Sequence, residues 1–407
     1  ASMPPRATTS PSDAVTPTEV PDADASPPPP PAEYAHRFSP NRAQIVANGG
    51  GNARTEQAVR SALAWLAAAQ SADGRWDAAR HGAGDERVVL GHDRRGAGAQ
   101  ADTGVSGLAL LAFLGGGHTQ RSGPYAANIS KGLKYLGRTQ APDGALYGRA
   151  QIFAQMYCHS MATLAVCEAY AITRDRSLKP TVRAAIKYSL ASQHPVDGGW
   201  RYLPGHTGDT SQLGWQLMAL RSAETARIEV PAITWTRIDR FLRSVRRGSR
   251  GGLAAYRPEG RSTRTMTAEA LLCRLLLAQQ RASDLDDAAV NEAVASLLRE
   301  PPDQRRMNLY YWYYATLALH HGNDRSPLAS AAWAEWNSAL TRSLLAAQRP
   351  DGSWPETSVW GGYGGRVYTT ALAAMCLEVY YRYTPPPRKH SPGRPNVARR
   401  GWSAVPR

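Results

Sequence analysis

Carboxylic acids stand near the predicted starts of three helices, where they are placed to act on a ligand. Asp102 and Asp209 each precede a Thr, and Glu269 lies in the first turns of another helix. Two carboxyl groups that face each other across an opening are the usual catalytic pair of glycan-cleaving enzymes. An Asp at a helix start is also a favoured N-cap, because its oxygen accepts a hydrogen bond from an unpaired backbone N–H. The three residues are therefore candidate catalytic groups, with helix capping as the alternative for the two Asp residues.

An aromatic run over residues 308–314 is the second feature that suggests ligand binding. On a helix, Tyr310 and Tyr313 share one face. Aromatic faces stabilise carbocations and also stack on sugar rings, whereas core packing between helices is the alternative. The other candidates for a ligand cavity or its mouth lie at or near the starts of similar helices: Tyr157, His206, Trp215 and Tyr368.

Gly-rich segments with Arg and Tyr precede several of these helix starts. Residues 199–204 and 252–258 resemble each other, and both combine Gly with Tyr and Arg. A rim of this composition is suited to an anion or a sugar. Turn chemistry repeated together with the fold explains it equally well.

Apolar residues at helical spacing predict the elements that carry these side chains. The helices come in pairs whose starts are about fifty residues apart, as in helical repeat proteins. The last pair is as apolar as the middle ones, which favours closure into a toroid over an open array with polar caps. The second helix of each pair is the more apolar, so we place it in the inner ring. The expected pairs are 55–70 with a helix from 102, 128–140 with 155–172, 180–192 with 209–224, 233–246 with 264–280, 286–299 with 307–321, and 331–347 with 367–383.

Composition divides the chain into three parts. Residues 1–45 are rich in Pro, Ala, Ser and Thr and predict a disordered tether. Residues 46–384 form the repeat region, and residues 385–407 form a basic Pro- and Arg-rich tail. No run of 18 apolar residues occurs, so no transmembrane helix is expected. The tether suggests association with a membrane or cell envelope, although the location and the oligomeric state stay open.

The formal net charge of +15 comes mostly from Arg, since only five of the 48 basic residues are Lys. These Arg residues are spread along the chain, which argues against a nucleic-acid interface. A lipid or small apolar ligand is a separate expectation, and it follows from the family resemblance described below. The four Cys residues sit in apolar helical patterns and are expected to be buried free thiols.

A short pattern recurs at the ends of the first helices of the pairs: a basic residue, an aromatic residue followed by Leu, then Gln, Gly and Trp. It resembles the QW repeat of the squalene cyclase and protein prenyltransferase superfamily, over about residues 46–384. The resemblance implies an α6/α6 barrel with its mouth at the inner-helix N-termini, in which Gln and Trp tie successive outer helices together. The copies are Arg60, Trp65, Leu66, Gln70, Gly74 and Trp76; Gln140 and Gly144; Gln193, Gly198 and Trp200; and Gln348, Gly352 and Trp354.

The resemblance also implies where catalytic groups should stand, and the chain departs from it there. Family cyclases carry an Asp-x-Asp-Asp-Thr segment, but residues 206–210 read His-Thr-Gly-Asp-Thr, with Gly208 in place of the proton donor. Family prenyltransferases hold zinc with Asp, Cys and a His that opens an inner helix. Residues 367–369 occupy the similar place without a His, and Cys158 and His159 point about 100° apart on a helix. We therefore predict no metal and no cofactor, and keep His159 as a catalytic candidate.

Three functions remain open from the sequence. The first is binding or transforming an isoprenoid or other apolar ligand in a central cavity, as the resemblance implies. The second is a glycan-binding or glycan-cleaving toroid that uses the carboxyl groups at the mouth. The third is a non-catalytic interaction scaffold tethered at the cell envelope, which the missing catalytic groups favour.

Overall fold

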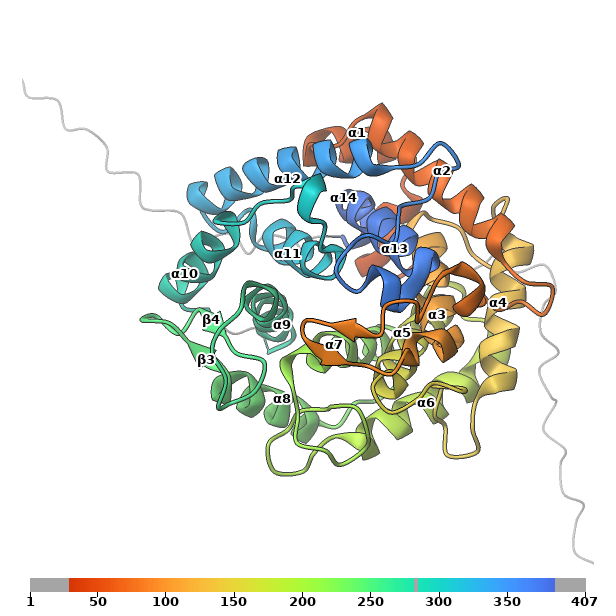
Figure 1. Ribbon diagram of the computed structural model, residues 1–407, viewed down its shortest axis with the longest axis horizontal. Coiled ribbons are helices and arrows are strands. Elements are labelled where there is room, and N and C mark those ends of the chain that lie inside the picture. The colour runs from red at the N-terminus through yellow and green to blue at the C-terminus, as the bar shows by residue number, and fades with distance from the viewer. Residues whose placement is uncertain (1–28, 282–284, 385–407) are drawn as a thin grey trace, which may run out of the picture.

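The computed structural model describes residues 29–281 and 285–384 (Figure 1). Within them, six helical hairpins form two concentric rings, so the predicted all-α toroid is confirmed. The outer ring contains α2 (Ala53–Ala69), α4 (Ala126–Thr139), α6 (Lys179–Ser192), α8 (Ala232–Ser244), α10 (Asp287–Leu298) and α12 (Pro327–Ala347). The inner ring contains α3 (Asp102–Gly115), α5 (Gln155–Thr173), α7 (Thr210–Thr225), α9 (Arg264–Arg281), α11 (Leu309–Gly322) and α13 (Gly361–Leu377).

The remaining described elements are short. Two antiparallel hairpins pair β1 (Val88–Val89) with β2 (His92–Asp93) and β3 (Arg246–Arg247) with β4 (Leu253–Ala254). The single-turn 3-10 helices in the loops are η2 (Ala79–His81), η3 (Ala97–Gln100), η4 (Arg176–Leu178) and η5 (Gln304–Arg306).

The inner helices are buried on every side because the outer ring covers one face and neighbouring inner helices cover the others. Each inner helix packs against the next, and α13 returns to α3, which closes the ring. All fourteen residues of α3 are buried, and its sequence is apolar around its whole circumference. A helix of this kind belongs in the interior of a protein, whereas outer helices such as α4 carry one apolar face.

The repeated Gln joins outer helices at four of the six junctions in the described ring, since the ends of α8 and α10 have no such Gln. Gln70 Nε2 donates to the carbonyl oxygen of Gly74 in its own turn, at 2.9 Å, and to that of Asn128 at 3.0 Å. Gln348 makes the same pair of bonds, to Gly352 and to Ala58 of α2, both at 2.9 Å. The last copy of the repeat thus bonds to the first outer helix. Gln140 and Gln193 form the equivalent bonds.

The repeated Trp and Gly complete the same turn. The indole N–H of Trp76 donates to the Leu66 carbonyl at 2.7 Å, within the preceding helix, and the ring is fully buried. Gly352 has φ +91°, in the left-handed region, and a Cβ there would collide with the Ser61 carbonyl of the next outer helix. Gly is therefore needed both for the backbone conformation and for the close approach. The Gln bonds thus connect successive outer helices as the resemblance implied, whereas the Trp indole N–H groups bond within their own outer helices.

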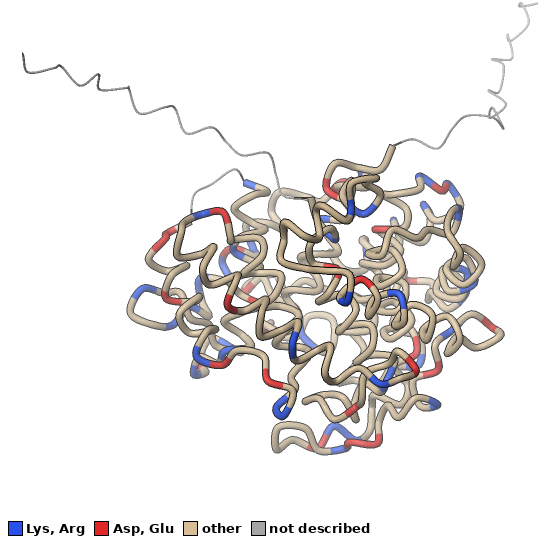
Figure 2. Tube along the Cα trace, turned by 90° about the horizontal axis from the view of Figure 1, so that it is seen from above, with Lys and Arg blue, Asp and Glu red and all other residues tan. Residues whose placement is uncertain are grey.

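The end of the barrel opposite the inner-helix N-termini is closed by segments from both ends of the described chain. These are η1 (Ala32–Phe38) and α1 (Arg42–Gly49) from one side and α14 (Val379–Arg382) from the other. Thr384 N donates to the Glu33 carbonyl at 2.7 Å, and both chain ends lie on this face (Figure 2). The predicted tether boundary at residue 45 is therefore wrong, since residues 32–49 are helical and packed on the barrel. Residues 1–28 and the tail 385–407 lie outside the described residues.

A buried charge cluster fixes this closure. Glu168 of α5 accepts hydrogen bonds from Arg37 of η1 at 2.6 Å and from Tyr383 at 3.0 Å. Arg382 of α14 lies 3.7 Å from the same carboxylate and donates to the Leu111 carbonyl of α3 at 2.9 Å. Burial opposes ionisation, but Arg37 and Arg382 hold the pKa of Glu168 below its usual value. Burying charges is costly unless they are paired, and here two cations share a carboxylate.

Other expectations of the sequence are tested on the described residues. All four Cys residues lie there, and each is buried and free, as predicted. No helix in the described part of the chain combines the length and the apolarity that a membrane crossing needs. Basic and acidic residues are interspersed along the outer elements (Figure 2).

A matched pair of glycine substitutions tests whether close approach at the repeated turn holds the ring together. Gly352→Ala places a methyl group against a backbone carbonyl, whereas Gly205→Ala has the same sign of φ, +74°, with open space around it. We expect Gly205→Ala to lower the free energy of unfolding by about 1 kcal/mol. Gly352→Ala should cost about 2 kcal/mol more, because the two outer helices must separate. Urea denaturation of both variants measures the difference, and equal losses would contradict the close-approach argument.

Candidate functional site

A cavity of about 590 Å³ opens at the N-terminal ends of the inner helices. Its deeper wall is apolar, with Val105 and Leu108 from α3, Met161 from α5 and Met266 from α9. Aromatic and hydroxyl side chains lie nearer the mouth. None of the described residues that line it is Asp or Glu. The polar and aromatic side chains that line the cavity are His92, Arg94, Phe153, Tyr157, Tyr202, Ser211, Tyr256, Thr263, Thr265, Asn308, Tyr310, Trp360, Tyr363 and Tyr368.

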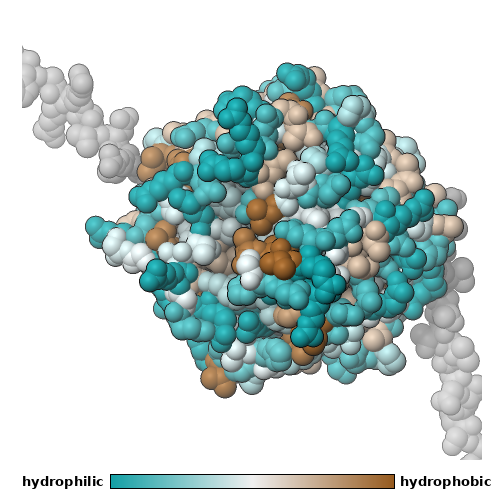
Figure 3. All heavy atoms as spheres, in the orientation of Figure 1, coloured by the Kyte–Doolittle hydropathy of each residue, from teal (hydrophilic) through white to brown (hydrophobic). Residues whose placement is uncertain are grey.

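The β1–β2 hairpin lies over the mouth (Figure 1). Its two-residue turn is Leu90-Gly91, with φ values of 51° and 77°, as a type I′ turn requires. Leu is an unusual residue for a left-handed conformation, and here the side chain lines the cavity while 68% of its surface is exposed. On the face of the toroid that contains the mouth, hydrophobic residues gather at the centre, where the hairpin lies (Figure 3). Backbone strain of this kind clusters at ligand-binding elements.

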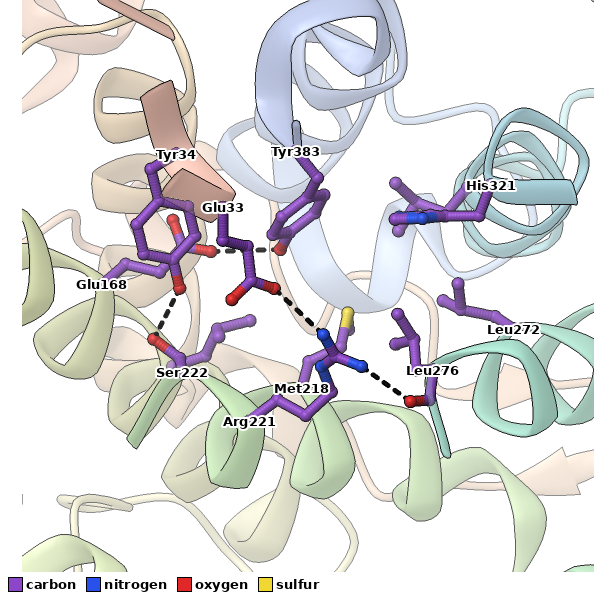
Figure 4. A pocket seen from close by; sticks show the side chains of 12 residues that line it. Glu33, Tyr34, Glu168, Met218, Arg221, Ser222, Leu272, Leu276, His321 and Tyr383 are labelled. Carbon is purple, nitrogen blue, oxygen red and sulfur yellow. Dashed lines mark hydrogen bonds and ion pairs between the residues drawn. The ribbon is translucent and has the colours of Figure 1, made fainter. Parts of the chain in front are cut away.

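A second, much smaller pocket lies at the closed end of the barrel (Figure 4). Its volume is about 20 Å³, which is room for about one water molecule. The polar groups around it already pair with one another: Arg221 with Glu33, Tyr34 with Ser222, and Tyr383 with Glu168. This pocket is a packing gap, and the ligand-sized space is the cavity at the mouth.

Asp209 is the N-cap of α7 and is fully buried, so the capping role considered for it is present. Its carboxylate accepts hydrogen bonds from Gln212 N at 3.0 Å, Ser211 Oγ at 2.8 Å and Tyr256 Oη at 2.7 Å. Burial raises the pKa of Asp209 to about 6, although these bonds and Arg201, 3.5 Å away, favour the charged form. Asp209 is therefore an acid that titrates near neutral pH.

Hydrogen bonds connect Asp209 to the cavity, which its own side chain does not line. On one side, Ser211 Oγ lies 2.5 Å from Tyr157 Oη. On the other, Tyr256 Oη lies 2.9 Å from Tyr202 Oη. All four of these hydroxyl-bearing residues line the cavity. A proton on Asp209 thus has a path of two hydroxyl groups to a bound molecule on either side.

Glu269 of α9 is also buried behind the wall. Its Oε1 accepts from Gly214 N at 3.0 Å, and Oε2 lies 3.1 Å from Tyr310 Oη. Burial raises the pKa of Glu269 well above its usual value. The Tyr310 hydroxyl donates toward Glu269 Oε2 and toward the Ser211 carbonyl, which lies 2.8 Å away. The role of Glu269 in this arrangement is to orient Tyr310, which does line the cavity.

The structure places Asp102 and His159 away from the cavity. Asp102 accepts from Ala78 N at 2.9 Å and pairs with Arg149 at 3.1 Å; its side chain does not cap α3. His159 Nδ1 accepts from Leu146 N at 3.1 Å, and burial lowers the pKa of His159 to about 3. His159 is thus a neutral structural group.

Its position in the repeat explains this role. In the first and last helix pairs, an inner-helix hydroxyl accepts a hydrogen bond from the backbone N–H at the Trp position of the repeat: Ser106 from Trp76, and Thr370 from Trp354. His159 accepts the equivalent bond from Leu146 N. His159 is the version of this contact in the second helix pair. The expectation that His159 acts on a ligand is therefore not supported by its geometry.

Of the residues expected at the cavity or its mouth, three reach it and three do not. Tyr157, Tyr310 and Tyr368 line the cavity. Trp215 and Tyr313 stack on each other behind the wall, with ring centroids 5.4 Å apart and an interplanar angle of 10°. Both rings are fully buried, so they are core residues. His206 is exposed in the loop before α7 and does not line the cavity.

The sequence analysis missed several wall residues, because they lie in irregular segments without helical periodicity. Arg94 follows β2, Phe153 precedes α5, and Trp360 is the N-cap of α13. Tyr363 belongs to the Gly-rich start of α13. In the described part of the chain, no group of three or more His, Cys, Asp and Glu side chains is placed to hold a metal ion.

Comparison with known proteins supports the superfamily. Residues 44–236, which cover the first three helix pairs, match the model of the squalene-hopene cyclase C-terminal domain. The resemblance to the squalene cyclase and protein prenyltransferase superfamily is confirmed. No curated protein sequence matches the chain significantly.

Solved structures share the α/α toroid fold at low sequence identity. An inactive variant of an α-1,6-mannanase from Salegentibacter, bound to α-1,6-mannotriose, is 10% identical with a TM-score of 0.54, over 80% of this chain and 99% of that one. A D-mannose isomerase is 11% identical with a TM-score of 0.54, over 80% and 96%. A type II terpene cyclase from Scytonema, bound to merosterolic acid A, is 16% identical with a TM-score of 0.47, over 81% and 96%. The first two likenesses show the α/α toroid fold alone.

The raised pKa of Asp209 predicts a pH-dependent loss of stability. A carboxyl whose pKa is higher in the folded than in the unfolded chain stabilises the fold at low pH, and this contribution is lost as the pH rises through about 6. Asp209→Asn removes the charged form and keeps an N-cap oxygen. Relative to the parent protein, its free energy of unfolding should rise by about 2 kcal/mol between pH 4 and pH 8.

Urea denaturation at several pH values measures this difference. Asp93→Asn is the control, because it removes a carboxyl that is exposed to water in the folded protein. A constant difference between Asp209→Asn and the parent protein from pH 4 to pH 8 would show that Asp209 has no raised pKa.

Proposed function

We propose that the chain binds an apolar molecule of isoprenoid size in the cavity at the centre of the toroid. The observation that carries this proposal is the wall itself, which is apolar in its depth and has no carboxylate among the described residues that line it. A volume of about 590 Å³ falls within the usual size of small-molecule sites. The burial of apolar surface then supplies the binding free energy, and the hydroxyl groups near the mouth orient a polar end.

The glycan alternative has less support. Glycoside hydrolysis needs two carboxyl groups that face the substrate from either side of the scissile bond. Here Glu269 and Asp209 bond to backbone and hydroxyl groups behind the wall, and Asp102 is held by Arg149. The likeness to mannanases concerns the fold, which hosts many functions. The scaffold alternative predicts a filled centre, whereas the centre here is hollow.

The chemistry that the site supports is proton transfer to an oxygen atom of the ligand. An alkene is a very weak base, and the position of the family's proton donor is occupied by Gly208. Asp209, with a pKa of about 6, is a moderate acid that reaches the cavity through Ser211 and Tyr256. Such a relay suits a hydroxyl or carbonyl group of the ligand.

A cavity-filling substitution tests the binding proposal. Met161→Trp places an indole in the deep, apolar part of the cavity, whereas Met161→Leu nearly conserves the volume. The parent protein should bind farnesol, a fifteen-carbon isoprenoid alcohol, as measured by isothermal titration calorimetry. Met161→Trp should weaken this binding at least about tenfold, and Met161→Leu by no more than about threefold.

The same titration with α-1,6-mannotriose separates the alternatives. Binding of the trisaccharide without binding of farnesol would favour the glycan hypothesis. Binding of neither molecule would favour the scaffold hypothesis. Thermal melting of both Met161 variants shows whether they remain folded.

Substitution of Leu90 in the hairpin turn should have opposite effects on the stability of the protein and on the retention of a bound ligand. Asn tolerates the left-handed conformation of a type I′ turn far better than Leu, so Leu90→Asn should stabilise the protein by about 1 kcal/mol. The same change removes an apolar cover from the mouth and should speed farnesol release, measured by stopped-flow displacement. Val196→Asn, which alters another exposed apolar side chain, should change neither quantity. Unchanged release from Leu90→Asn would show that the hairpin does not cover the ligand.

A further inference from the structure

We propose that the ligand is an anionic amphiphile, whose carboxylate or phosphate head is bound by Arg94 at the mouth of the cavity. This inference rests on the proposed function and names the chemical class of the ligand. It is carried by an arginine without an acidic partner and by two polar atoms in the wall without a hydrogen bond.

Arg94 is held in place by aromatic rings from two other segments. Its guanidinium carbon lies 5.4 Å from the ring centroid of Phe153 and 5.6 Å from that of Trp360. Nη1 donates to Tyr202 Oη at 3.2 Å. Trp360 has φ +68°, a strained conformation for a bulky residue, and this conformation is part of the backbone that places the indole beside Arg94. The guanidinium is thus fixed before any ligand binds.

The charge on Arg94 is not balanced within the described chain. Among the described residues that line the cavity, Arg94 is the only Arg, and none of the others is Lys, Asp or Glu. Arg94 forms no ion pair with any acidic residue of the described chain. Arg201, by contrast, lies 3.5 Å from Asp209. A partly buried cation beside an apolar surface attracts an anion strongly, because little water competes there. The binding partner that this position lacks is therefore negatively charged.

Two side chains of the wall, Arg94 and Tyr363, also carry polar atoms that no group of the described chain pairs with. Arg94 Nε and Tyr363 Oη are both buried, and neither has a partner in the described chain. Leaving a buried donor unpaired costs free energy, which a bound acceptor returns. Burial raises the pKa of Tyr363, so its hydroxyl remains a donor. A guanidinium and a phenol together match the oxygen atoms of a carboxylate or phosphate.

The position of these groups also orients the ligand. Arg94 lies at the mouth beside the β1–β2 hairpin, whereas Val105, Leu108 and Met161 line the deeper wall. The anionic head therefore stays at the mouth and the apolar chain enters the toroid. Leu90 in the hairpin turn then covers the junction between head and chain.

Three ligands with the same chain test the proposal: farnesoic acid, farnesyl phosphate and farnesol. We expect the parent protein to bind at least one of the two anions about tenfold more tightly than the alcohol. Arg94→Gln should weaken binding of that anion about 10- to 100-fold and leave the alcohol within about threefold. The control is Arg87→Gln, which removes an exposed Arg beside the same hairpin and should leave all three affinities unchanged.

Each outcome decides a separate point. A preference for the acid or for the phosphate identifies the head, and either result supports the proposal. An anion preference that persists in Arg94→Gln, or equal binding of acid, phosphate and alcohol by the parent protein, overturns it while leaving the proposed function intact. Failure of all three to bind the parent protein overturns the proposed function itself. Arg94→Lys, which keeps the charge without the planar fork, should lose part of the preference and provides the test should Arg94→Gln not fold.

Discussion

The structure depends on the closure of its ring, which requires every outer helix to meet the next at the same distance and angle. At four of the six junctions between the outer helices, a turn that contains Gln and Gly sets that distance. Gln348 makes with Ala58 the contact that Gln70 makes with Asn128, although 290 residues separate the first pair along the chain. An array of this kind remains open unless its repeat rotations add up to a full circle. The central cavity exists because they do, since the inner helices then surround a space that their side chains do not fill.

The site arises where the repeat is broken, and the repeat itself explains which polar residues are structural. His159 occupies the position of Ser106 and Thr370 and makes the same contact to a neighbouring turn. A buried imidazole with a pKa of about 3 is therefore one variant of a repeated hydrogen bond. Arg94 and Trp360 have no equivalent of this kind, because they belong to irregular loops. Both side chains line the cavity and contact each other, whereas the repeated polar residues contact the turns between the helices.

The fold was predictable from the sequence to within a few residues, because apolar spacing and the repeated Gly and Trp are local signals. The capping role of Asp209 was predictable for the same reason. The helices over residues 32–49 were missed because they are short and depend on contacts such as Arg37 with Glu168, 131 residues away. The aromatic run was located correctly, but helical spacing could not tell which face meets the cavity. An inner helix is buried on all sides, so the sequence pattern does not distinguish the face toward the cavity from the faces toward neighbouring helices. In the structure Tyr310 lines the cavity, whereas Tyr313 stacks on Trp215 behind the wall.

The two ends of the barrel differ in how their charges are paired, and the difference supports the open end as the proposed binding site. At the closed end, Glu168 lies beside both Arg37 and Arg382, and Glu378 pairs with Arg382 at 3.1 Å, so two buried cations face two carboxyl groups of the same chain. At the open end, Arg94 is held by aromatic rings that cannot neutralise it. Aromatic faces stabilise a cation, but they leave its N–H groups free to bind an acceptor. A charge cluster that serves stability is complete in the folded protein. Arg94, fixed beside a hollow, apolar space, has no acidic partner in the described chain, and this difference is what favours the proposed anionic ligand.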